Sequence, residues 1–406
     1  MGVREVDVLI IGGGMVGASL ATALARTQLE VLVAEAMPLR EAGQPSYDDR
    51  STAIAWGSSR VFERLGLWGR MAAEASAIHR VHVSEQGRFG ATRIDREQQR
   101  VPALGFLVPN RAMGAAFAQH FESGLGPQLL APAKLTALEP AGDRAEGSFA
   151  TPDGELRVRA RLVVAADGAA STARSLLGIG ASTHDYGQTA IISNVTPSRR
   201  HGGTAYERFT SAGPVALLPH GEARCNLIYT VDSAAAADAM ALDDTAFLAA
   251  LQARFGWRLG RFEQVGARFA YPLSLVLSEA AVCGRVALIG NAAHSLHPVA
   301  GQGFNLGLRD AMALAELVGD AAAAGVDPGD SALLQRYADW RRADQRNVSM
   351  FTDALARAFA NTGPAASAAR SLALLAVDLL PPVKRGLAAA TMGRAGGLPR
   401  ILRESG

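Results

Sequence analysis

Cysteine, lysine and long runs of like charge are scarce in this chain of 406 residues. The two cysteines, Cys225 and Cys283, lie far apart and outside any C-x-x-C spacing, so neither a disulfide framework nor a cysteine-based zinc site is expected. A reduced cytoplasmic interior suits such a chain. The 40 basic and 38 acidic residues leave a net charge of +2 without a basic cluster, so nucleic acid is not an expected partner.

A membrane-spanning helix is not expected either. The segment from Val8 to Ala25 is uncharged and long enough by count to cross a bilayer, but the glycine triplet from Gly12 to Gly14 divides it into a strand and a helix start. The chain exceeds the size at which a single core keeps growing, so two closely packed domains are expected.

The N-terminal segment has the pattern of a dinucleotide-binding unit. Val6 to Ile11 predicts a buried strand, Met15 to Arg26 a helix and Val31 to Ala34 a second strand, which ends at Glu35. The first turn carries the G-x-G-x-x-G glycines Gly12, Gly14 and Gly17. These glycines permit a tight turn and close approach of a phosphate, and the carboxylate can accept hydrogen bonds from a ribose. The acid favours FAD or NAD over NADP at this site.

Two further strands are predicted to end in glycine-containing turns. Arg161 to Ala166 leads to Asp167 and Gly168, and Arg285 to Ile289 leads to Gly290 and Asn291. In an open parallel sheet, ligands collect at the carboxyl ends of the strands, so one extended ligand is expected to cross several of these turns.

The turn after Asn291 leads into a glycine-rich loop and then a helix that is expected to begin near Asn305. Gly301 and Gly303 allow close backbone approach, and the helix start directs free N–H groups at whatever binds there. By itself this loop could hold a phosphate, a substrate carboxylate or the electron-rich ring of a reduced flavin.

The middle of the chain has a residue pattern different from that of the segments on either side. Between about 186 and 271, short β-prone segments separated by Gly, Pro, Ser and His predict an antiparallel sheet with a helix around Asp244 to Phe255. The expected division is a discontinuous nucleotide-binding domain at 1–80, 101–185 and 272–340, an inserted substrate domain at 81–100 and 186–271, and a helical region at 341–406. The predicted fold class is therefore α/β, with a Rossmann-like domain, an inserted antiparallel sheet and a C-terminal helical region.

The C-terminal segment from 366 to 406 combines basic and apolar residues. Its basic residues, Arg370, Lys384, Arg385, Arg394, Arg400 and Arg403, outnumber the acids Asp378 and Glu404. Leu372, Leu375 and Leu379 form an apolar stripe beside them. Two interpretations stay open, a segment that rests on a membrane surface and a helix that packs on the nucleotide domain with solvated arginines.

The three turns, taken in chain order, resemble those of the FAD-dependent aromatic hydroxylases of the p-hydroxybenzoate hydroxylase type. Gly12/Gly14/Gly17, Asp167-Gly168 and Gly290-Asn291 match the family's pattern, except that Asn291 replaces the usual Asp. The stretch from Ala292 to Asp310 is similar to the corresponding block of the ubiquinone-biosynthesis hydroxylases. Further stretches resemble the 2-octaprenyl-6-methoxyphenol hydroxylase (UbiH-type) branch: Asp49-Arg50, Tyr206 to Thr210, Phe255 to Gly260 and Tyr271 to Leu273.

This resemblance implies a monooxygenase that uses FAD, O2 and NAD(P)H to hydroxylate the ring of a polyprenyl phenol through a flavin hydroperoxide. It places the flavin ring against Gly301, Gln302, Gly303, Phe304 and Asn305, where N–H groups would stabilise the negative charge of the reduced flavin. It also carries over Arg50 and Arg111 as FAD contacts, although single arginines are commonly surface residues. No second G-x-G-x-x-G follows a strand, so NAD(P)H is expected to bind transiently near Asp167 and the flavin.

Side chains that could activate the phenol are sought in the substrate domain. Tyr206, Arg208, His220 and Tyr271 lie there, and each is equally explained as an ordinary sheet residue. His294 and His297 are three residues apart, but Pro298 follows them and no cluster of further ligands supports a metal site, so no metal is expected.

Two rivals to the hydroxylase interpretation stay open. One is a flavoprotein of the same fold that hydroxylates a soluble aromatic or reduces a prenyl chain, and the other is a flavin-bound component of a biosynthetic complex with weak catalysis of its own. The implied lipid substrate predicts a cytoplasmic protein, peripheral on the inner face of the bacterial membrane, with other ubiquinone-biosynthesis proteins as partners.

Overall fold

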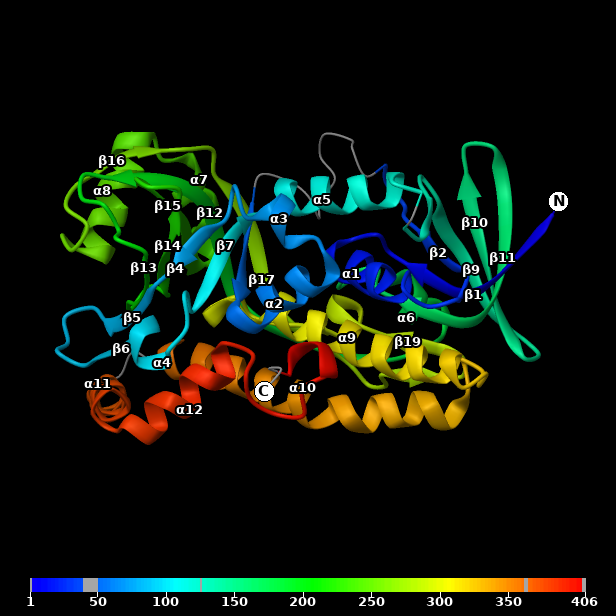
Figure 1. The fold of residues 1–406 in the computed structure, drawn as a ribbon. Coiled ribbons are helices and arrows are strands. Elements are labelled where there is room, and N and C mark those ends of the chain that lie inside the picture. The colour runs from blue at the N-terminus through cyan, green and yellow to red at the C-terminus, as the bar shows by residue number, and fades with distance from the viewer. Residues whose placement is uncertain (1, 39–49, 125, 361–363, 404–406) are drawn as a thin grey trace.

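The computed structural model describes residues 2–38, 50–124, 126–360 and 364–403. Two large sheets lie at opposite ends of an elongated molecule, and the helices that follow residue 302 run along one side of both (Figure 1). A small third sheet and its helices connect the two ends.

The first sheet has a parallel centre. Its strands, in spatial order, are β18 (Val282–Cys283), β19 (Val286–Leu288), β11 (Gly154–Ala165), β1 (Val3–Ile11), β2 (Val31–Ala34) and β8 (Gln128–Leu130), with β10 (Arg144–Thr151) and β9 (Lys134–Ala141) as an antiparallel extension beside β11. The uncharged run from Val8 is a strand, a turn and a helix, as predicted. Residues of β1 and β11 are buried on both faces, because helices cover one face and β9, β10 and α6 (Thr172–Leu176) cover the other.

Long helices cover the first face of this sheet. They are α1 (Met15–Leu24), α5 (Asn110–Glu122), α9 (Gln302–Ala323) and α10 (Ser331–Ala360). Apolar residues of α1 and α9 join those of β1 and β11 in one core that includes Tyr337 of α10. The expected fold class, α/β with a Rossmann-like domain, an antiparallel sheet and a C-terminal helical region, is confirmed.

The second sheet is antiparallel except for one pair. Its strands are β20 (His294–Ser295), β17 (Phe269–Ser278), β12 (Ala181–Pro197), β15 (Arg224–Asp232), β14 (Val215–His220), β13 (Thr204–Phe209), β5 (Arg80–Glu85) and β6 (Ala91–Asp95), and β16 (Phe262–Val265) pairs with β12. β13 and β5 are parallel. Most of these strands lie within 81–100 and 186–271, the segments expected for the substrate domain, whereas β12 begins at Ala181 and β17 and β20 lie partly or wholly beyond 271. The division into domains stays a prediction.

The two faces of the second sheet have different neighbours. One face packs against α8 (Asp244–Phe255) through a buried cluster that includes Ile191, Leu217 and Leu227. η1 (Ser233–Ala235) and α7 (Ala236–Ala241) lie beside that cluster. On the opposite face, the register places Tyr271 opposite Ala190, and Glu207 opposite Ala216. Arg50, which precedes the third sheet, lies over the ring of Tyr271, so this second face is turned toward the nucleotide-binding layer.

The third sheet joins the two larger ones. It consists of β3 (Ser51–Ala55), β7 (Gly105–Pro109) and β4 (Ser76–Ile78), and α2 (Trp56–Leu65) packs on β3 and β7. α3 (Trp68–Met71) contacts α2 and α5, and α4 (Arg96–Gln99) contacts β6. Short 3-10 turns, η2 (Gly290–Ala292) and η3 (Val299–Gly301), lead from β19 to α9.

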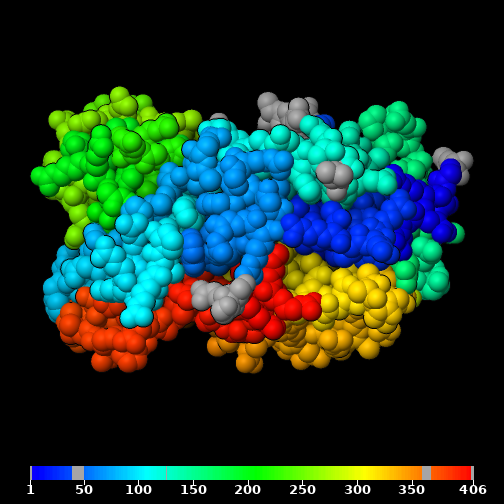
Figure 2. All heavy atoms as spheres, viewed as in Figure 1, coloured from blue at the N-terminus to red at the C-terminus, as the bar shows by residue number. Residues whose placement is uncertain are grey.

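The chain ends in α11 (Pro364–Leu379), α12 (Pro381–Thr391) and η4 (Arg400–Leu402). α11 packs on β6 and β5, where Oγ1 of Thr92 donates to the carbonyl of Leu374 and Arg370 pairs with Glu85 across 2.7 Å. In Figure 2 the orange C-terminal helices lie against the blue and cyan N-terminal half. Within the described ranges, no helix has the length and hydropathy of a membrane span.

Candidate cofactor-binding and active site

The first glycine turn brings α1 close to β1. Gly12 has a φ of +104°, and a Cβ there would lie 2.5 Å from the carbonyl oxygen of Ala166, so only glycine fits. A Cβ on Gly17 would lie 2.0 Å from the carbonyl oxygen of Gly12. Gly14 is the N-cap of α1 and supplies no side-chain cap, so the first N–H groups of the helix are left for an anionic ligand.

Glu35 lies at the end of β2, beside this turn. Its Oε2 accepts a hydrogen bond from the N–H of Gly13 at 2.6 Å, and its Oε1 accepts one from the N–H of Met37 at 3.0 Å. These bonds hold the carboxylate in one position, and each oxygen has a second lone pair for a ribose hydroxyl. Its role as a ribose contact stays a prediction.

The second turn is braced by Asp167. Its carboxylate accepts hydrogen bonds from Oγ of Ser171, the N-cap of α6, at 2.6 Å and from the N–H of Ala173 at 3.0 Å, so it supports the start of α6. Gly168 has a φ of +87°, which favours glycine. These bonds hold the turn in one conformation. The turn lies beside the first glycine turn, because Ile11 and Ala165 are paired in the parallel sheet.

Arg174 joins the second turn to the third. Its Nη1 donates to the carbonyl of Ala292 at 2.8 Å, and its Nη2 donates to the carbonyl of Ala169 at 2.9 Å. The side chain is buried, so these bonds hold the two turns together. All three predicted turns thus lie at the carboxyl edge of neighbouring parallel strands.

The third turn packs tightly under α9. Gly290 has a φ of +58°, and a Cβ on Gly307 would lie 2.9 Å from the Cα of Gly290. Asn291 is exposed at this turn, where its amide is accessible to a ligand. The close approach of α9 explains why glycines occur on both sides of this contact.

The start of α9 differs from the sequence-based expectation. The helix begins at Gln302 rather than near Asn305. The reason is that Ala300 and Gly301, with φ of +62° and +59°, reverse the chain before Gln302 and make Gly301 the N-cap. Gly303 therefore lies in the first helical turn, and open space surrounds the position that a Cβ would take there.

The side chains of this first turn contact the protein itself. Oδ1 of Asn305 accepts hydrogen bonds from the N–H of Ala55 at 2.8 Å and from Oγ of Ser58 at 2.7 Å, and its Nδ2 donates to the carbonyls of Ala53 and Gly301. Nε2 of Gln302 donates to the carbonyls of Ala300 and Thr391, and the ring of Phe304 stacks on that of Phe62. A ligand at this helix start would thus be met mainly by backbone groups, and the predicted flavin contacts of Gly301 to Asn305 stay predictions.

A buried charged network anchors the loop from behind. Nε2 of His294 lies 2.5 Å from Oδ2 of Asp310, and Nε of Arg341 donates to Oδ1 of the same carboxylate at 2.6 Å. Burial by itself would raise the pKa of Asp310, but Arg341 and His294 outweigh it and lower the pKa to about 2. His294 is thus bound to a single carboxylate, and Asp310 was not among the expected site residues.

His297 is buried further along the loop. Burial lowers its pKa to about 4, so the ring is neutral near pH 7. Its Nδ1 accepts a hydrogen bond from the N–H of Val299 at 3.2 Å, and its ring meets the ring of Tyr186 edge to face at 5.0 Å. Tyr186 in turn donates to Asp353 of α10 at 3.0 Å, which ties the loop to that helix.

The two arginines carried over as FAD contacts lie near the junction of the sheets. The guanidinium of Arg50 lies 4.8 Å from the centroid of the Tyr271 ring. Arg111, on the first turn of α5, forms an ion pair with Glu74 at 2.5 Å. His220 lies close enough to Arg111 that, after burial and Arg224, its charge helps to lower the pKa of that histidine. Their roles stay predictions.

Tyr206 and Arg208 lie on the face of the second sheet that packs against α8. The ring of Tyr206 meets that of Phe255 edge to face at 5.6 Å. Arg208 lies beside Phe255 and Trp257 in a surface hollow. Both side chains therefore point away from the face that carries Tyr271.

Glu207 lies between them in sequence and points the other way. Its side chain is half-buried, and no hydrogen bond or ion pair joins it to any residue in the described part of the chain. Desolvation alone raises its pKa to about 7. Glu207 lies on the face of the second sheet that carries Tyr271, and that face is turned toward the nucleotide-binding layer. A carboxyl with a strongly shifted pKa on that face is a candidate functional residue.

The residues of these turns fit FAD. The uncapped starts of α1 and α9 both offer N–H groups at the same sheet edge, and no atom lies within 4 Å of the position that a Cβ would take at Gly303. No acidic side chain lies in the first turn of either helix, so no side chain of these two turns repels a negatively charged ligand.

Known proteins are similar to this chain over most of its length. Residues 5–352 match the model of the FAD binding domain family. The ubiquinone hydroxylase UbiL of Rhodospirillum rubrum is 40% identical over 94% of this chain and 88% of its own length. The 3-demethoxyubiquinol 3-hydroxylase of Escherichia coli is 31% identical over 94% of this chain and 97% of its own length.

The fold also matches that of a solved enzyme. The p-nitrophenol 4-monooxygenase PnpA of Pseudomonas putida superimposes with a TM-score of 0.79 over 98% of this chain and 99% of its own, at 20% identity. That likeness concerns the fold, whereas the sequence matches are high enough to show the family. The chain therefore belongs to the FAD binding domain family and, within it, to the ubiquinone hydroxylases, which are FAD-dependent monooxygenases.

Proposed function

We propose that this protein hydroxylates the aromatic ring of a polyprenyl phenol intermediate of ubiquinone synthesis, with FAD as cofactor, O2 as co-substrate and NAD(P)H as reductant. The observation that carries the proposal is the start of α9, where an uncapped helix turn and the open space at Gly303 meet the two other nucleotide-binding turns. The names of the relatives, UbiL and the 3-demethoxyubiquinol 3-hydroxylase, support the substrate class.

In this proposal the turns divide the cofactor between them. Gly12, Gly14 and Gly17 approach the pyrophosphate, Glu35 accepts from the ribose, and Asn291 contacts the chain that leads to the flavin. Bound FAD would supply the activation of O2. The protein contributes the N–H groups of Gly303 and its neighbours, which stabilise negative charge on the ring in a site that excludes water.

Glu207 is the proposed acceptor of the phenol proton. A phenol directs electrophilic attack to its ring more strongly once its oxygen carries negative charge, so a base near that oxygen speeds the reaction. A carboxyl with a pKa of about 7 is half ionised at neutral pH and suits general base catalysis. Glu207 faces the same side of the sheet as Tyr271, whose ring lies against Arg50 next to β3.

The reductant is proposed to bind transiently at the turn formed by Asp167 and Gly168. The left-handed backbone at Gly168 and the hydrogen bond that Asp167 accepts from the first turn of α6 supply a preformed surface beside the flavin turns. A transient reductant agrees with the single G-x-G-x-x-G of the sequence.

A membrane contact is proposed for the junction of α11 and α12. Leu372, Leu379, Leu380 and Val383 are between 48% and 67% exposed there. Much of the basic excess of this segment is already paired, since Arg370 binds Glu85 and Lys384 binds Asp378. The apolar ridge formed by these four residues, rather than net charge, would therefore bring the enzyme to a polyprenylated substrate, alongside other ubiquinone-biosynthesis proteins.

The function is tested by removing the protein from its host and by assaying the FAD-loaded enzyme. The host is expected to accumulate a quinone precursor that lacks one ring hydroxyl. The purified enzyme is expected to convert that precursor with NAD(P)H and to incorporate one oxygen atom from ¹⁸O2, as measured by mass spectrometry. A host that accumulates no such precursor would contradict the proposal, and hydroxylation of soluble phenols alone would favour the rival of the same fold.

A further inference from the structure

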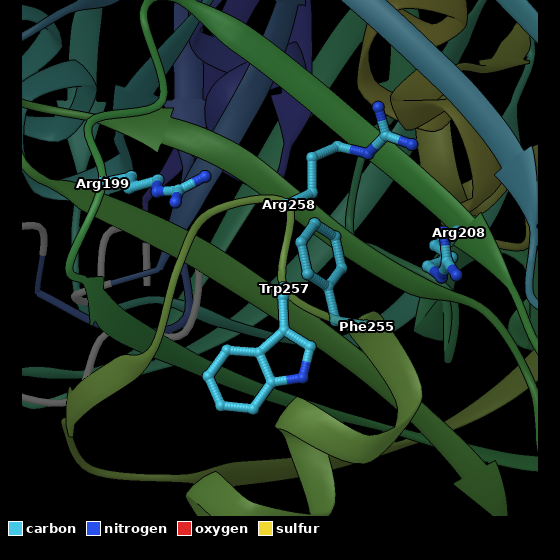
Figure 3. Close-up of a pocket in the computed structure, with 6 residues that line it drawn as sticks. Arg199, Arg208, Phe255, Trp257 and Arg258 are labelled. Carbon is cyan, nitrogen blue, oxygen red and sulfur yellow. The ribbon is translucent and has the colours of Figure 1, made fainter.

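A hollow lies on the face of the second sheet that packs against α8. It has a volume of about 460 Å³ and is lined by Arg199, Arg208, Phe255, Gly256, Trp257 and Arg258 (Figure 3). Glu207 and Tyr271 lie on the opposite face of the sheet, so the hollow is separate from the proposed site of hydroxylation.

Three parts of the chain form this hollow. α8 ends at Phe255, and Gly256, with a φ of +83°, turns the chain so that Trp257 and Arg258 follow at the surface. Arg208 comes from β13 and Arg199 from the segment after β12. In the view of Figure 3, Arg199 lies to one side of the two aromatic rings and Arg208 to the other.

The arginines of the hollow have no acidic counterpart. Among the described residues no ion pair involves Arg199, Arg208 or Arg258, and Nε of Arg208 is buried without a hydrogen-bond partner. Two acids of neighbouring segments are placed elsewhere, because Glu207 points to the opposite face and Glu222 lies 3.5 Å from Arg200.

Further observations show that this positive charge is uncompensated. Burial and the charge of Arg258 both lower the pKa of Arg208. His82, which is buried on the same face, has a pKa of about 4 because of burial and then Arg258, and neither of its ring nitrogens has a partner. The carbonyl of Gly256 accepts from Nε2 of Gln252 at 2.7 Å and is therefore already used. The like charges of Arg208 and Arg258 repel each other, and a bound anion would relieve this repulsion.

The chemistry of the lining selects a kind of anion. A guanidinium offers paired N–H donors that match two oxygens of a phosphate, and the indole of Trp257, 68% exposed, offers a flat apolar surface beside them. We propose that this hollow is a phosphate-binding site, formed by Arg199, Arg208 and Arg258 with Trp257 as the platform for the group that carries the phosphate. A soluble nucleotide and the headgroup of an anionic lipid share this chemistry.

Two stretches of the chain have no part in the proposed oxidation chemistry but contribute residues to this site. They are the segment from Phe255 to Gly260 and the Arg208 position of the segment from Tyr206 to Thr210. A ligand bound there would hold the enzyme at a surface or modulate it without reaching Glu207, which lies on the opposite face of the sheet.

The test measures binding to the FAD-loaded full chain by calorimetry and by thermal shift, with inorganic pyrophosphate, ADP and vesicles of phosphatidylglycerol or phosphatidylcholine as probes. Pyrophosphate or ADP is expected to raise the melting temperature, with binding that weakens as salt increases. Arg258→Ala should weaken this binding by at least about tenfold, Arg258→Lys less, and Trp257→Ala should weaken ADP more than pyrophosphate. Arg258 and Trp257 are exposed, so these variants are expected to fold.

Arg200→Ala is the matched control, because Arg200 adjoins Arg199 but already pairs with Glu222. It should bind each probe as the unchanged protein does. Binding of the soluble phosphates identifies a free ligand as the source, and binding of phosphatidylglycerol vesicles alone, lost in Arg258→Ala, identifies a lipid headgroup. The proposal is overturned if no probe binds, or if Arg258→Ala and Arg200→Ala bind every probe equally well.

Discussion

Nε of Arg341 donates a hydrogen bond to Oδ1 of Asp310 across 2.6 Å, and the two side chains are only 1% and 0% exposed. The bond joins α10 to α9 directly behind the loop that carries His294, whose ring binds the other oxygen of the same carboxylate. The helix start that faces the proposed flavin site thus depends on a buried ion pair between residues 31 positions apart.

The first prediction concerns this pair. Asp310→Asn removes the negative charge that pairs with the buried guanidinium of Arg341. Because a buried charge that loses its partner is costly, the change should lower the free energy of unfolding by about 3–5 kcal/mol. Because the folded protein lowers the pKa of Asp310 to about 2, the stabilisation is present above its ordinary value of 3.8 and is lost as the pH falls toward 2. Urea unfolding at several pH values measures both effects. The control is Asp339→Asn, which removes an exposed ion pair with Arg342 on α10 and should change the free energy of unfolding by less than about 1 kcal/mol. Equal losses of stability in the two variants would contradict the prediction.

The second prediction concerns the first glycine turn. Gly17→Ala places a Cβ 2.0 Å from the carbonyl oxygen of Gly12, so α1 must move away from the turn. FAD affinity should fall by more than about tenfold, as measured by the quenching of flavin fluorescence on titration. Gly319→Ala is the control, because its Cβ meets only a methyl group of Thr27 at 3.7 Å and the change should favour the helix by up to about 1 kcal/mol. Full FAD affinity in Gly17→Ala would show that the turn does not position the cofactor.

The third prediction concerns Glu207. In the unchanged enzyme kcat/KM should rise with pH and level off above about 7, the pKa of this carboxyl. Glu207→Gln should abolish this rise and lower product formation about 10²-fold or more, with less product formed per NAD(P)H oxidised. Glu222→Gln, which changes an exposed carboxyl, should retain the profile. A Glu207→Gln enzyme with the original pH profile would rule out the proposed proton acceptor.

The raised pKa of Glu207 also predicts a dependence of stability on pH. Its contribution is fully present below its ordinary value of 4.5 and is lost as the pH rises through about 7. The melting temperature should therefore decline between about pH 4.5 and 7 and level off above pH 7, and Glu207→Gln should reduce that decline. An identical slope in the two proteins would mean that this carboxyl is not desolvated.

The fourth prediction concerns the apolar ridge at the junction of α11 and α12. The double change Leu379→Ser and Leu380→Ser removes apolar surface that a bilayer would bury, at about 1.5–3 kcal/mol for each leucine. Sedimentation with vesicles should then fall by about tenfold or more, whereas Leu176→Ser, a change to an exposed leucine on α6, should leave it unchanged. Deletion of the whole segment is a poorer test, because it also exposes the buried Glu85 that Arg370 binds. Equal sedimentation of both variants would exclude the ridge as a contact surface.

Local patterns in the sequence determined much of the nucleotide-binding layer. The glycines at 12, 14 and 17, the acid at 35 and the alternation of buried strands with helices are short-range features, and each has a backbone requirement that few residues meet. The fold class and the alignment of three turns at one sheet edge follow from them, because parallel strands must end on the same side. The family could be identified for the same reason, since its blocks are contiguous.

Only the tertiary structure decided how the active face is assembled. Tyr206, Glu207 and Arg208 are consecutive, so the alternation of side chains along a strand places Glu207 on one face of the sheet and the other two on the opposite face. Only the pairing of β13 with β14 and β5 shows which of these faces is turned toward the nucleotide-binding layer. The start of α9 at Gln302 likewise depends on the left-handed backbone of Ala300 and Gly301. Only the glycine could be expected from the sequence to adopt that conformation. The partners of Asp310 and the unpaired charges beside Trp257 come from distant segments, and contacts between segments far apart in the chain are set by packing, which no local pattern records.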